Sequence, residues 1–208
     1  MSLPQIPSYR LPGENDLPAN RADWRPDPAR AVLLIHDMQR YFTAAFAGAE
    51  PLAGAAATMA GLRKVCADQG IPVIFTRQPG GQSRADRGLL LDMWGWGPPA
   101  DESAIAFHED LIPGEGDTVL EKRRYSAFVD SPLADLLQGR DQLIVTGIYA
   151  HIGVVATACD AFMRGVQPFV VADATADFSR ADHLGALGYV AKRCGMVLSA
   201  AQLRTALS

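Results

Sequence analysis

The chain has 208 residues, a formal net charge of −4 at pH 7, and a composition that is 49% hydrophobic and 20% charged. This length and composition predict one globular domain with a substantial core. The acidic balance, without a basic run or a zinc-ligand spacing, argues against a nucleic-acid-binding protein. The sequence shows neither a signal-peptide pattern nor an apolar run long enough to span a membrane.

The segment 1–30 is rich in proline and is expected to form an extended amino-terminal arm of the single domain 1–208. Its prolines are Pro4, Pro7, Pro12, Pro18, Pro26 and Pro28. The three cysteines are Cys66, Cys159 and Cys194, which are widely spaced and lie in apolar segments. An odd number of buried, separated cysteines indicates reduced thiols in a cytoplasmic protein.

Strand-like and helix-like segments alternate along the first half of the chain. The continuous apolar run 31–35 is typical of a strand buried on both faces. Helical spacing of apolar residues over 52–69 and the stop signal at Gly70 predict a helix, and 71–76 predicts the next strand. The segment 77–117 is irregular, and a loop of this length inside a compact domain is usually functional.

The alternation continues through the second half. The residues after 117 predict a short strand at 118–121, a helix from Ser131-Pro132 to Gly139, a strand at 143–148, a turn at 149–153, a helix at 154–163, a strand at 168–172, a helix near 181–191 and a strand at 195–198. Strands that alternate with crossover helices predict an α/β fold, namely a three-layer αβα arrangement around an open, mostly parallel sheet.

Ligands bind outside the carboxyl ends of the strands in such sheets. Asp37, Gln78, Lys122 and the turn 149–153 all fall at or just beyond a predicted strand end. A turn that leads from a strand into a helix points backbone N–H groups into a cleft, and many hydrolases place a Ser or Cys nucleophile there. Here Gly153 offers no side chain, so we expect no covalent intermediate from this turn.

Three segments resemble the signature segments of the isochorismatases: Ile35-His36-Asp37-Met38-Gln39-Arg40-Tyr41-Phe42, Lys122-Arg123-Arg124-Tyr125-Ser126-Ala127-Phe128 and Gly147-Ile148-Tyr149-Ala150-His151-Ile152-Gly153. The likeness extends through 171–174 and 176–179 and includes 17–20 and Trp24 in the arm. It therefore covers nearly the whole chain, and it implies the Rossmann-like, isochorismatase-like hydrolase fold.

Amidases of this superfamily use an Asp, Lys, Cys triad, whereas isochorismatases keep the Asp and Lys and replace the Cys with a small residue. The resemblance implies that Asp37, Lys122 and Gly153 are the catalytic positions. It implies a substrate pocket that includes Gln78, Arg87, Trp94, Tyr149 and Phe42. It further implies a cis peptide bond between Ile148 and Tyr149, a homodimer, and a reaction without metal or organic cofactor.

Isochorismatases hydrolyse a vinyl ether to pyruvate and a dihydroxylated cyclohexadiene carboxylate, and the difficult step is protonation of the terminal methylene carbon. We expect Asp37 to be the acid, which requires a raised pKa from burial or from the carboxylates of the substrate. Lys122 would act against that rise, so orientation and binding suit it better. Arg87 is the expected partner of a substrate carboxylate, and N–H groups of the turn 149–153 are expected to face substrate oxygen.

Two substrates fit the resemblance. Isochorismate leads toward siderophores, and 2-amino-2-deoxyisochorismate leads toward phenazines. The chain ends at Ser208, without the carrier domain of the bifunctional siderophore enzymes, which favours the phenazine type unless a separate aryl carrier protein is the partner. An amidase of the Cys family is disfavoured by Gly153. The alternatives are a Cys-independent relative of the amidases that acts on another small substrate, and an inactive scaffold that docks a carrier protein, which the retained Asp37 and Lys122 disfavour.

Several side chains have a simpler structural explanation. Arg87 could pair with Asp86 or Asp92 at the surface, and Trp94 with Trp96 could plug the core. His36 and His151 are expected to be structural, and Cys159 is expected to point away from the site. The family commonly has Trp after the motif lysine, so Arg123 is a departure that affects either the surface or the rim of the pocket.

Overall fold

The computed structural model describes residues 3–208, and within this range six strands form one parallel sheet in the order β3-β2-β1-β4-β5-β6. The strands are β1 (Ala31–His36), β2 (Val73–Arg77), β3 (Thr118–Glu121), β4 (Gln142–Ile148), β5 (Gln167–Ala176) and β6 (Met196–Leu198). From β1 the chain first builds toward β3 and then returns to add β4 on the opposite side of β1. The order therefore reverses between β1 and β4, which is where sheets of this type bind ligands.

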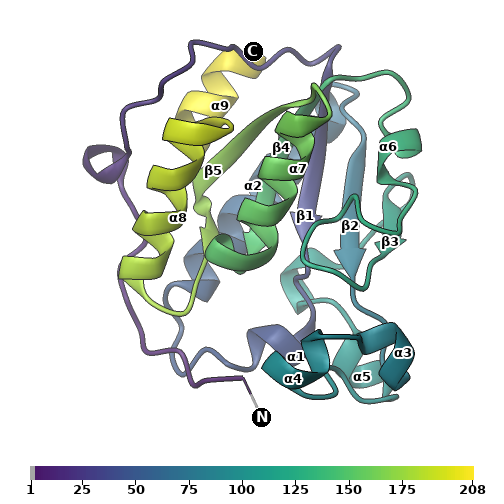
Figure 1. Ribbon diagram of the computed structural model, residues 1–208. Helices are drawn as coiled ribbons and strands as arrows, with labels where there is room; N and C mark the ends of the chain where they lie inside the picture. The colour runs from purple at the N-terminus through teal and green to yellow at the C-terminus, as the bar shows by residue number, and fades with distance from the viewer. Residues whose placement is uncertain (1–2) are drawn as a thin grey trace.

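Helices cover both faces of the sheet, as predicted. The helices are α1 (Arg40–Thr43), α2 (Leu52–Asp68), α3 (Arg84–Arg87), α4 (Leu90–Trp94), α5 (Glu102–Ile105), α6 (Leu133–Leu136), α7 (Val155–Met163), α8 (Arg180–Arg193) and α9 (Ala200–Leu207). In Figure 1, α7 and α8 lie in front of the sheet and α2 lies behind it. The three-layer αβα prediction is confirmed.

Each face of the sheet has its own hydrophobic core. Leu33 and Ile35 of β1 pack into the core under α2 and α9, whereas Val32 and Leu34 pack into the core under α6, α7 and α8. Every residue of β1 is buried. The alternation follows from the two-residue period of a strand, and it confirms that the run 31–35 is buried on both faces.

Several element boundaries differ from the predictions. β2 begins at Val73, after Pro72, which has no backbone N–H to donate to a sheet. The helix expected from Ser131-Pro132 to Gly139 is the single turn α6. β5 runs on to Ala176 and is twice the predicted length. α9 was not predicted, although Ser199 caps it and forms a capping box with Gln202.

The irregular segment 77–117 folds into three short helices, α3, α4 and α5, and a 3-10 turn, Glu109–Leu111. Together with α1 these helices form a separate layer below the carboxyl ends of the strands, at the lower right of Figure 1. The layer covers the sheet edge that carries the site residues, so the expectation of a functional loop agrees with its placement.

The described part of the arm, 3–30, is extended apart from a 3-10 turn, Glu14–Asp16, and a turn at 28–30. It runs along the α8 side of the molecule (Figure 1) and is tied down by side-chain hydrogen bonds. Asn20 accepts from the backbone N–H of Val197 at 2.7 Å and donates to its carbonyl at 2.9 Å. Within 3–208 no helix combines the length and the apolar character needed to cross a membrane.

Candidate active site

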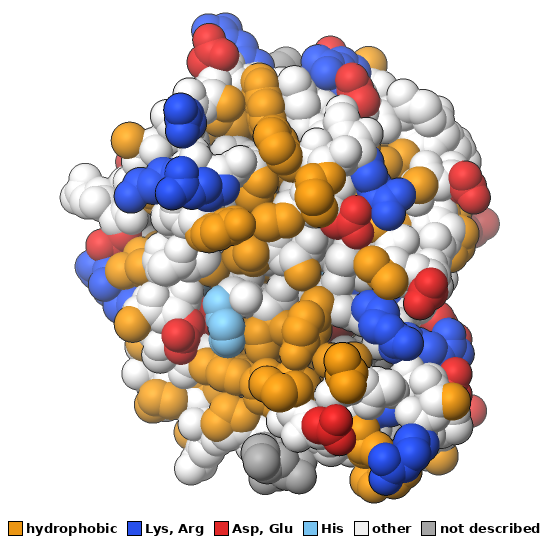
Figure 2. Space-filling model, in the orientation of Figure 1, with side chains coloured by type: hydrophobic (Ala, Val, Ile, Leu, Met, Phe, Trp, Pro, Cys, Tyr) orange, Lys and Arg blue, Asp and Glu red, His pale blue; other side chains and the backbone are white. Residues whose placement is uncertain are grey.

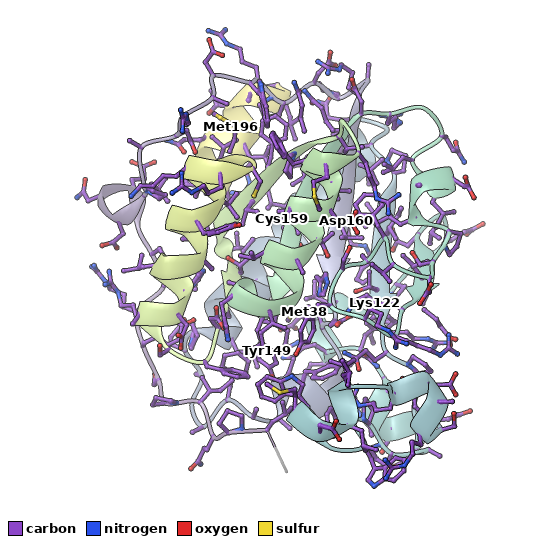
Figure 3. All side chains as sticks on the ribbon, in the orientation of Figure 1. Met38, Lys122, Tyr149, Cys159, Asp160 and Met196 are labelled. Carbon is purple, nitrogen blue, oxygen red and sulfur yellow. The ribbon has the colours of Figure 1, made fainter. Side chains whose placement is uncertain are left out.

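The polar side chains that the sequence placed at strand ends lie together at one edge of the sheet. Asp37 directly follows β1, Gln78 follows β2, Lys122 follows β3 and Tyr149 follows β4. These four strands are neighbours in the sheet and all are parallel. The labelled side chains of Lys122 and Tyr149 lie at this edge in Figure 3.

A cleft of about 470 Å³, including its open mouth, lies at this edge. It is lined by all the residues expected in the site: Asp37, Phe42, Gln78, Arg87, Trp94, Lys122, Tyr149 and Gly153. It is also lined by His36, Leu90, Tyr125, Ile148 and Ile152, which were not expected there.

Asp37 and Lys122 form a buried ion pair on the floor of the cleft. Lys122 Nζ lies 2.7 Å from Asp37 Oδ2, and the two side chains are 1% and 7% exposed. Thr76 holds the other carboxylate oxygen, because its hydroxyl donates to Asp37 Oδ1 at 2.6 Å and accepts from the Asp37 backbone N–H at 3.0 Å. Asp37 has a φ of +50°, a strained conformation for a residue other than Gly, which is typical of functional sites.

The pKa of Asp37 is lowered, contrary to the rise expected for a general acid. Burial acts to raise this pKa, but the charge of Lys122, the neighbouring His36 and the hydrogen bonds from Lys122 and Thr76 outweigh the burial. The free protein therefore holds Asp37 as a carboxylate. The sequence could not show this, because the effect depends on the 2.7 Å separation between the two side chains.

Arg87 is 3% exposed and does not pair with Asp86 or Asp92. Its guanidinium donates to Gln78 Oε1 at 2.9 Å and to the carbonyl of Gly95 at 2.8 Å, which are both neutral acceptors. Within 3–208 no carboxylate forms an ion pair with it. A buried cation of this kind is costly unless an anion joins it.

Gln39 fixes the position of Gln78 in the cleft. Its side-chain oxygen accepts from the Gln78 backbone N–H at 2.7 Å, and its side-chain nitrogen donates to the Gln78 carbonyl at 2.9 Å. Gln39 is fully buried. The backbone of Gln78 is thus held from both sides, which leaves the Gln78 side chain to bond Arg87.

Aromatic side chains form the wall opposite the charged groups. Tyr149 packs edge-on to Phe42 with ring centroids 6.3 Å apart, and to Phe178 at 4.6 Å. The Tyr149 hydroxyl donates a hydrogen bond to the Phe42 carbonyl at 2.8 Å, so its hydrogen-bond partner is a group of the protein itself. Trp94 Nε1 donates to the Tyr125 hydroxyl at 2.6 Å. The idea that Trp94 and Trp96 plug the core is wrong, because Trp94 lines the cleft and Trp96 is 58% exposed.

The turn expected at 149–153 is a π-helical turn, Ala150–Val154, that leads into α7. The backbone N–H of Ile152 bonds the Tyr149 carbonyl at 3.1 Å, and that of His151 bonds Asp177 Oδ2 at 2.7 Å. Those two N–H groups therefore do not face a substrate, contrary to expectation. The peptide bond between Ile148 and Tyr149 is cis, as the resemblance implied.

Asp177 ties this turn to the end of β5. Its buried carboxylate accepts from the backbone N–H and from Nδ1 of His151, the latter at 2.5 Å, and from the backbone N–H of Phe178 at 2.8 Å. The pKa of His151 is raised by its hydrogen bond to Asp177. His151 thus has the structural role that was expected of it.

His36 belongs to the site, although the sequence suggested a structural role alone. It is the last residue of β1, it is fully buried, and its Nδ1 lies 3.6 Å from Asp37 Oδ2. Tyr125 was also missed as a lining residue. His36 and Tyr125 both lie in motif segments, and this was the sequence signal that could have pointed to them. A position next to a functional residue does not, however, show which way a side chain points.

The remaining expectations concern residues outside the cleft. Arg123 lies 3.8 Å from Asp86 at the surface and does not line the cleft. Cys159 lies on α7, away from Lys122 and Tyr149 (Figure 3), with its sulfur 3.6 Å from that of Cys194. Within the described residues no group of three or more His, Cys, Asp and Glu side chains is placed to hold a metal ion.

The cleft carries a local positive charge in an acidic protein. Its charged lining groups are Asp37, Lys122 and Arg87, which sum to +1, against −4 for the chain. Burial lowers the pKa of His36 to about 4, so its imidazole is neutral near pH 7. The arrangement favours a small anionic ligand bound between the cations and the aromatic wall.

The fold is an αβα fold that is shared with solved hydrolases. The solved structure of a cysteine hydrolase from Pseudomonas syringae superposes with a TM-score of 0.81 and 22% identity, covering 91% of this chain and 96% of that chain. This likeness concerns the fold. The sequence comparisons give the narrower assignment.

Residues 31–202 match the model of the isochorismatase domain, and the chain belongs to the isochorismatase family. It is 49% identical to Isochorismatase of Bacillus subtilis, with 95% of this chain and 64% of that protein covered. It is 49% identical to Enterobactin synthase component B of Escherichia coli (98% and 72% covered) and 47% identical to Phenazine biosynthesis protein PhzD1 of Pseudomonas aeruginosa (95% and 96% covered). The chain thus spans about two thirds of the first two relatives.

Proposed function

We propose that this protein hydrolyses the vinyl ether of isochorismate or of 2-amino-2-deoxyisochorismate and releases pyruvate. The observation that carries the proposal is the buried Arg87, which has no carboxylate partner within 3–208 and lies in one cleft with the Asp37–Lys122 pair. A substrate carboxylate would supply the missing anion, in the two-pronged geometry that a guanidinium favours. The names of the relatives of Bacillus, Escherichia and Pseudomonas support the same reaction class.

The reaction needs an acid and a water molecule, and it needs no nucleophile from the protein. A proton from Asp37 goes to the terminal methylene carbon, and the vinyl carbon–carbon double bond becomes a single bond to a methyl group. The resulting oxocarbenium ion takes up water, and the proton released from that water returns to Asp37. The hemiketal then breaks the bond between its ketal carbon and the ring oxygen; its hydroxyl loses a proton to become the ketone of pyruvate, and the ring oxygen gains a proton to become the ring alcohol. Gly153 fits this scheme, because nothing at that position can form a covalent intermediate.

Asp37 must gain a proton before it can act, since the free protein holds it as a carboxylate. The substrate carries two carboxylates, and their charge near Asp37 would raise its pKa. A carboxylate that also engages Lys122 would weaken the pull of the ammonium on Asp37. We therefore propose that substrate binding is coupled to proton uptake by Asp37, while Lys122 orients Asp37 and the substrate.

The direct test supplies the purified protein with each of the two substrates and follows pyruvate with a lactate dehydrogenase assay. Pyruvate release from either substrate supports the proposal, and the ratio of kcat/KM between the two identifies the preferred one. The relatives named for siderophore and for phenazine synthesis are 49% and 47% identical, so these identities do not separate the pathways. Release from neither substrate would favour the inactive scaffold instead.

The partners and the location remain part of the proposal. We propose a homodimer and a separate aryl carrier protein as the partner if the substrate is isochorismate; the relationship to Enterobactin synthase component B supports the latter. We also propose a cytoplasmic location on the basis of cysteine usage. The space-filling view shows hydrophobic side chains gathered in a band over the face that carries α7 and α8 (Figure 2), where Phe162, Met163 and Tyr189 are exposed.

A further inference from the structure

The imidazole of His36 fills the space beside Gly153. A Cβ atom added at Gly153 would overlap His36 Cε1 and would lie 2.8 Å from Nε2 and 2.9 Å from Nδ1. These three ring atoms are the nearest obstacles to that Cβ. The ring is fully buried and lines the cleft. Any side chain at residue 153 therefore competes with His36 for the same volume.

The backbone at Gly153 does not itself require glycine. Its φ lies outside the left-handed region, and the residue sits within a helical turn. Alanine is preferred over glycine in such a conformation. The obstacle to a side chain at this position is thus the imidazole of His36, which approaches from β1.

His36 is held firmly in that space. Its Nδ1 lies 3.0 Å from the Ile148 carbonyl, the last residue of β4. Gly147, which faces His36 in the sheet register, allows β4 to approach closely, because a Cβ there would overlap the backbone of His36. With the imidazole neutral, an Nδ1–H that donates to Ile148 leaves Nε2 without a proton, and Nε2 has no hydrogen-bond partner within 3–208. The ring therefore occupies space without adding charge to the Asp37–Lys122 pair.

We infer that His36 determines the reaction specificity of this site by occupying the volume that a nucleophilic side chain at residue 153 would need. The inference rests on the proposed function, in which the protein supplies a proton and no nucleophile. His36 and Gly153 then act as one steric unit. The imidazole at 36 leaves room only for glycine at 153. A substitution at 153 alone therefore cannot place a nucleophilic side chain in the cleft.

A double-mutant cycle tests the unit. Gly153→Ala adds the Cβ alone. His36→Asn retains a donor for the Ile148 carbonyl but removes Cε1 and Nε2, the atoms that block the Cβ most directly. We expect Gly153→Ala to lower the Tm by at least about 4 °C in the native background, because overpacking a filled site is destabilising. In the His36→Asn background we expect the same change to leave the Tm unchanged or to raise it.

Gly185→Ala is the matched control, because Gly185 lies in α8 and a Cβ there meets nothing within 4 Å. It should not lower the Tm in either background. If His36→Asn does not fold, His36→Val provides a second background that also lacks the blocking atoms. Equal effects of Gly153→Ala in both backgrounds would overturn the inference, whatever the pyruvate assay shows. Absence of pyruvate release, by contrast, would overturn the proposed function and leave the steric result intact.

Cysteine at residue 153 gives an independent readout. We expect iodoacetamide to alkylate Cys in Gly153→Cys at least about tenfold faster when His36 is also replaced by Asn, since the thiol then has room to lie in the cleft. The tryptic peptide that contains residue 153 also contains Cys159, so fragmentation of this peptide in the mass spectrometer is used to measure the rate at residue 153. Equal rates with and without His36 would contradict the inference.

Discussion

Lys122 Nζ lies 2.7 Å from Asp37 Oδ2, and both side chains are buried just beyond the carboxyl ends of β3 and β1, which β2 separates in the sheet. The contact makes the proposed acid a carboxylate in the free protein. It also makes each partner dependent on the other, because a buried charge that loses its partner is strongly destabilising. The proposed catalytic role and the stability of the fold thus depend on the same two residues.

Asp37→Asn should reduce kcat by at least about 10²- to 10⁴-fold, the usual contribution of general acid catalysis. It should also reduce the free energy of unfolding by about 3–5 kcal/mol, because Lys122 is left buried without its partner. The pyruvate assay and urea denaturation measure the two effects. The double variant Asp37→Asn/Lys122→Met should recover much of the stability and none of the activity. Near-normal turnover by Asp37→Asn would remove Asp37 as the acid.

Arg87→Met should raise KM by roughly 10- to 100-fold, as expected for the loss of a charged hydrogen bond to a substrate carboxylate. Arg87→Lys should recover little of this, because an ammonium lacks the fork of donors. Arg123→Met is the matched control, since Arg123 is a partly exposed arginine outside the cleft. Its effect on KM should stay below about fivefold. An unchanged KM in Arg87→Met would contradict carboxylate binding by Arg87.

Binding of a substrate analogue with a saturated side chain should be accompanied by uptake of about one proton per ligand, because the ligand carboxylates raise the lowered pKa of Asp37. Titration calorimetry in two buffers with different ionisation enthalpies measures this uptake. Asp37→Asn should abolish it without abolishing binding. A binding enthalpy of the native protein that does not depend on the buffer would exclude coupled protonation.

The free energy of unfolding should fall as the pH is lowered from about 6.5 to about 4. Burial lowers the pKa of His36 and of His183 to about 4. The unfolded chain therefore takes up protons in this range while the two folded imidazoles stay neutral. Asp37 adds a further loss at lower pH, because its lowered pKa stabilises the fold above the unfolded value and that contribution disappears on protonation.

Urea denaturation at pH 7 and at pH 5 measures the pH dependence. His183→Asn should reduce it without altering the cleft, because His183 lies in α8 and bonds Thr175 and Tyr9 rather than a lining residue. His151, whose pKa is raised, changes the stability in the opposite direction. The test is therefore the difference between the native protein and the variant, and a pH dependence that His183→Asn leaves unchanged would contradict a buried, neutral His183.

Much of the site could be predicted because strand ends in a parallel sheet share an edge. Asp37, Gln78 and Lys122 follow three adjacent strands, so their proximity follows from the alternation of elements. The positions of Thr76 and Tyr125 in the site could not be predicted, since a strand residue can face either side of the sheet and a loop residue can face any direction. The short helices of 77–117 and the end of α6 also escaped prediction, because single turns carry too little periodicity to detect.

The sequence by itself determined the αβα architecture, the edge of the sheet that carries the site, and the absence of a nucleophile at Gly153. These properties are local, since they depend on hydrophobic periodicity, capping residues and the identity of one residue. The tertiary structure alone decided the charge state of Asp37, the internal use of the Tyr149 hydroxyl, and the approach of His36 to Gly153. Each depends on a distance between residues far apart in the chain, and electrostatic and steric energies change steeply with such distances.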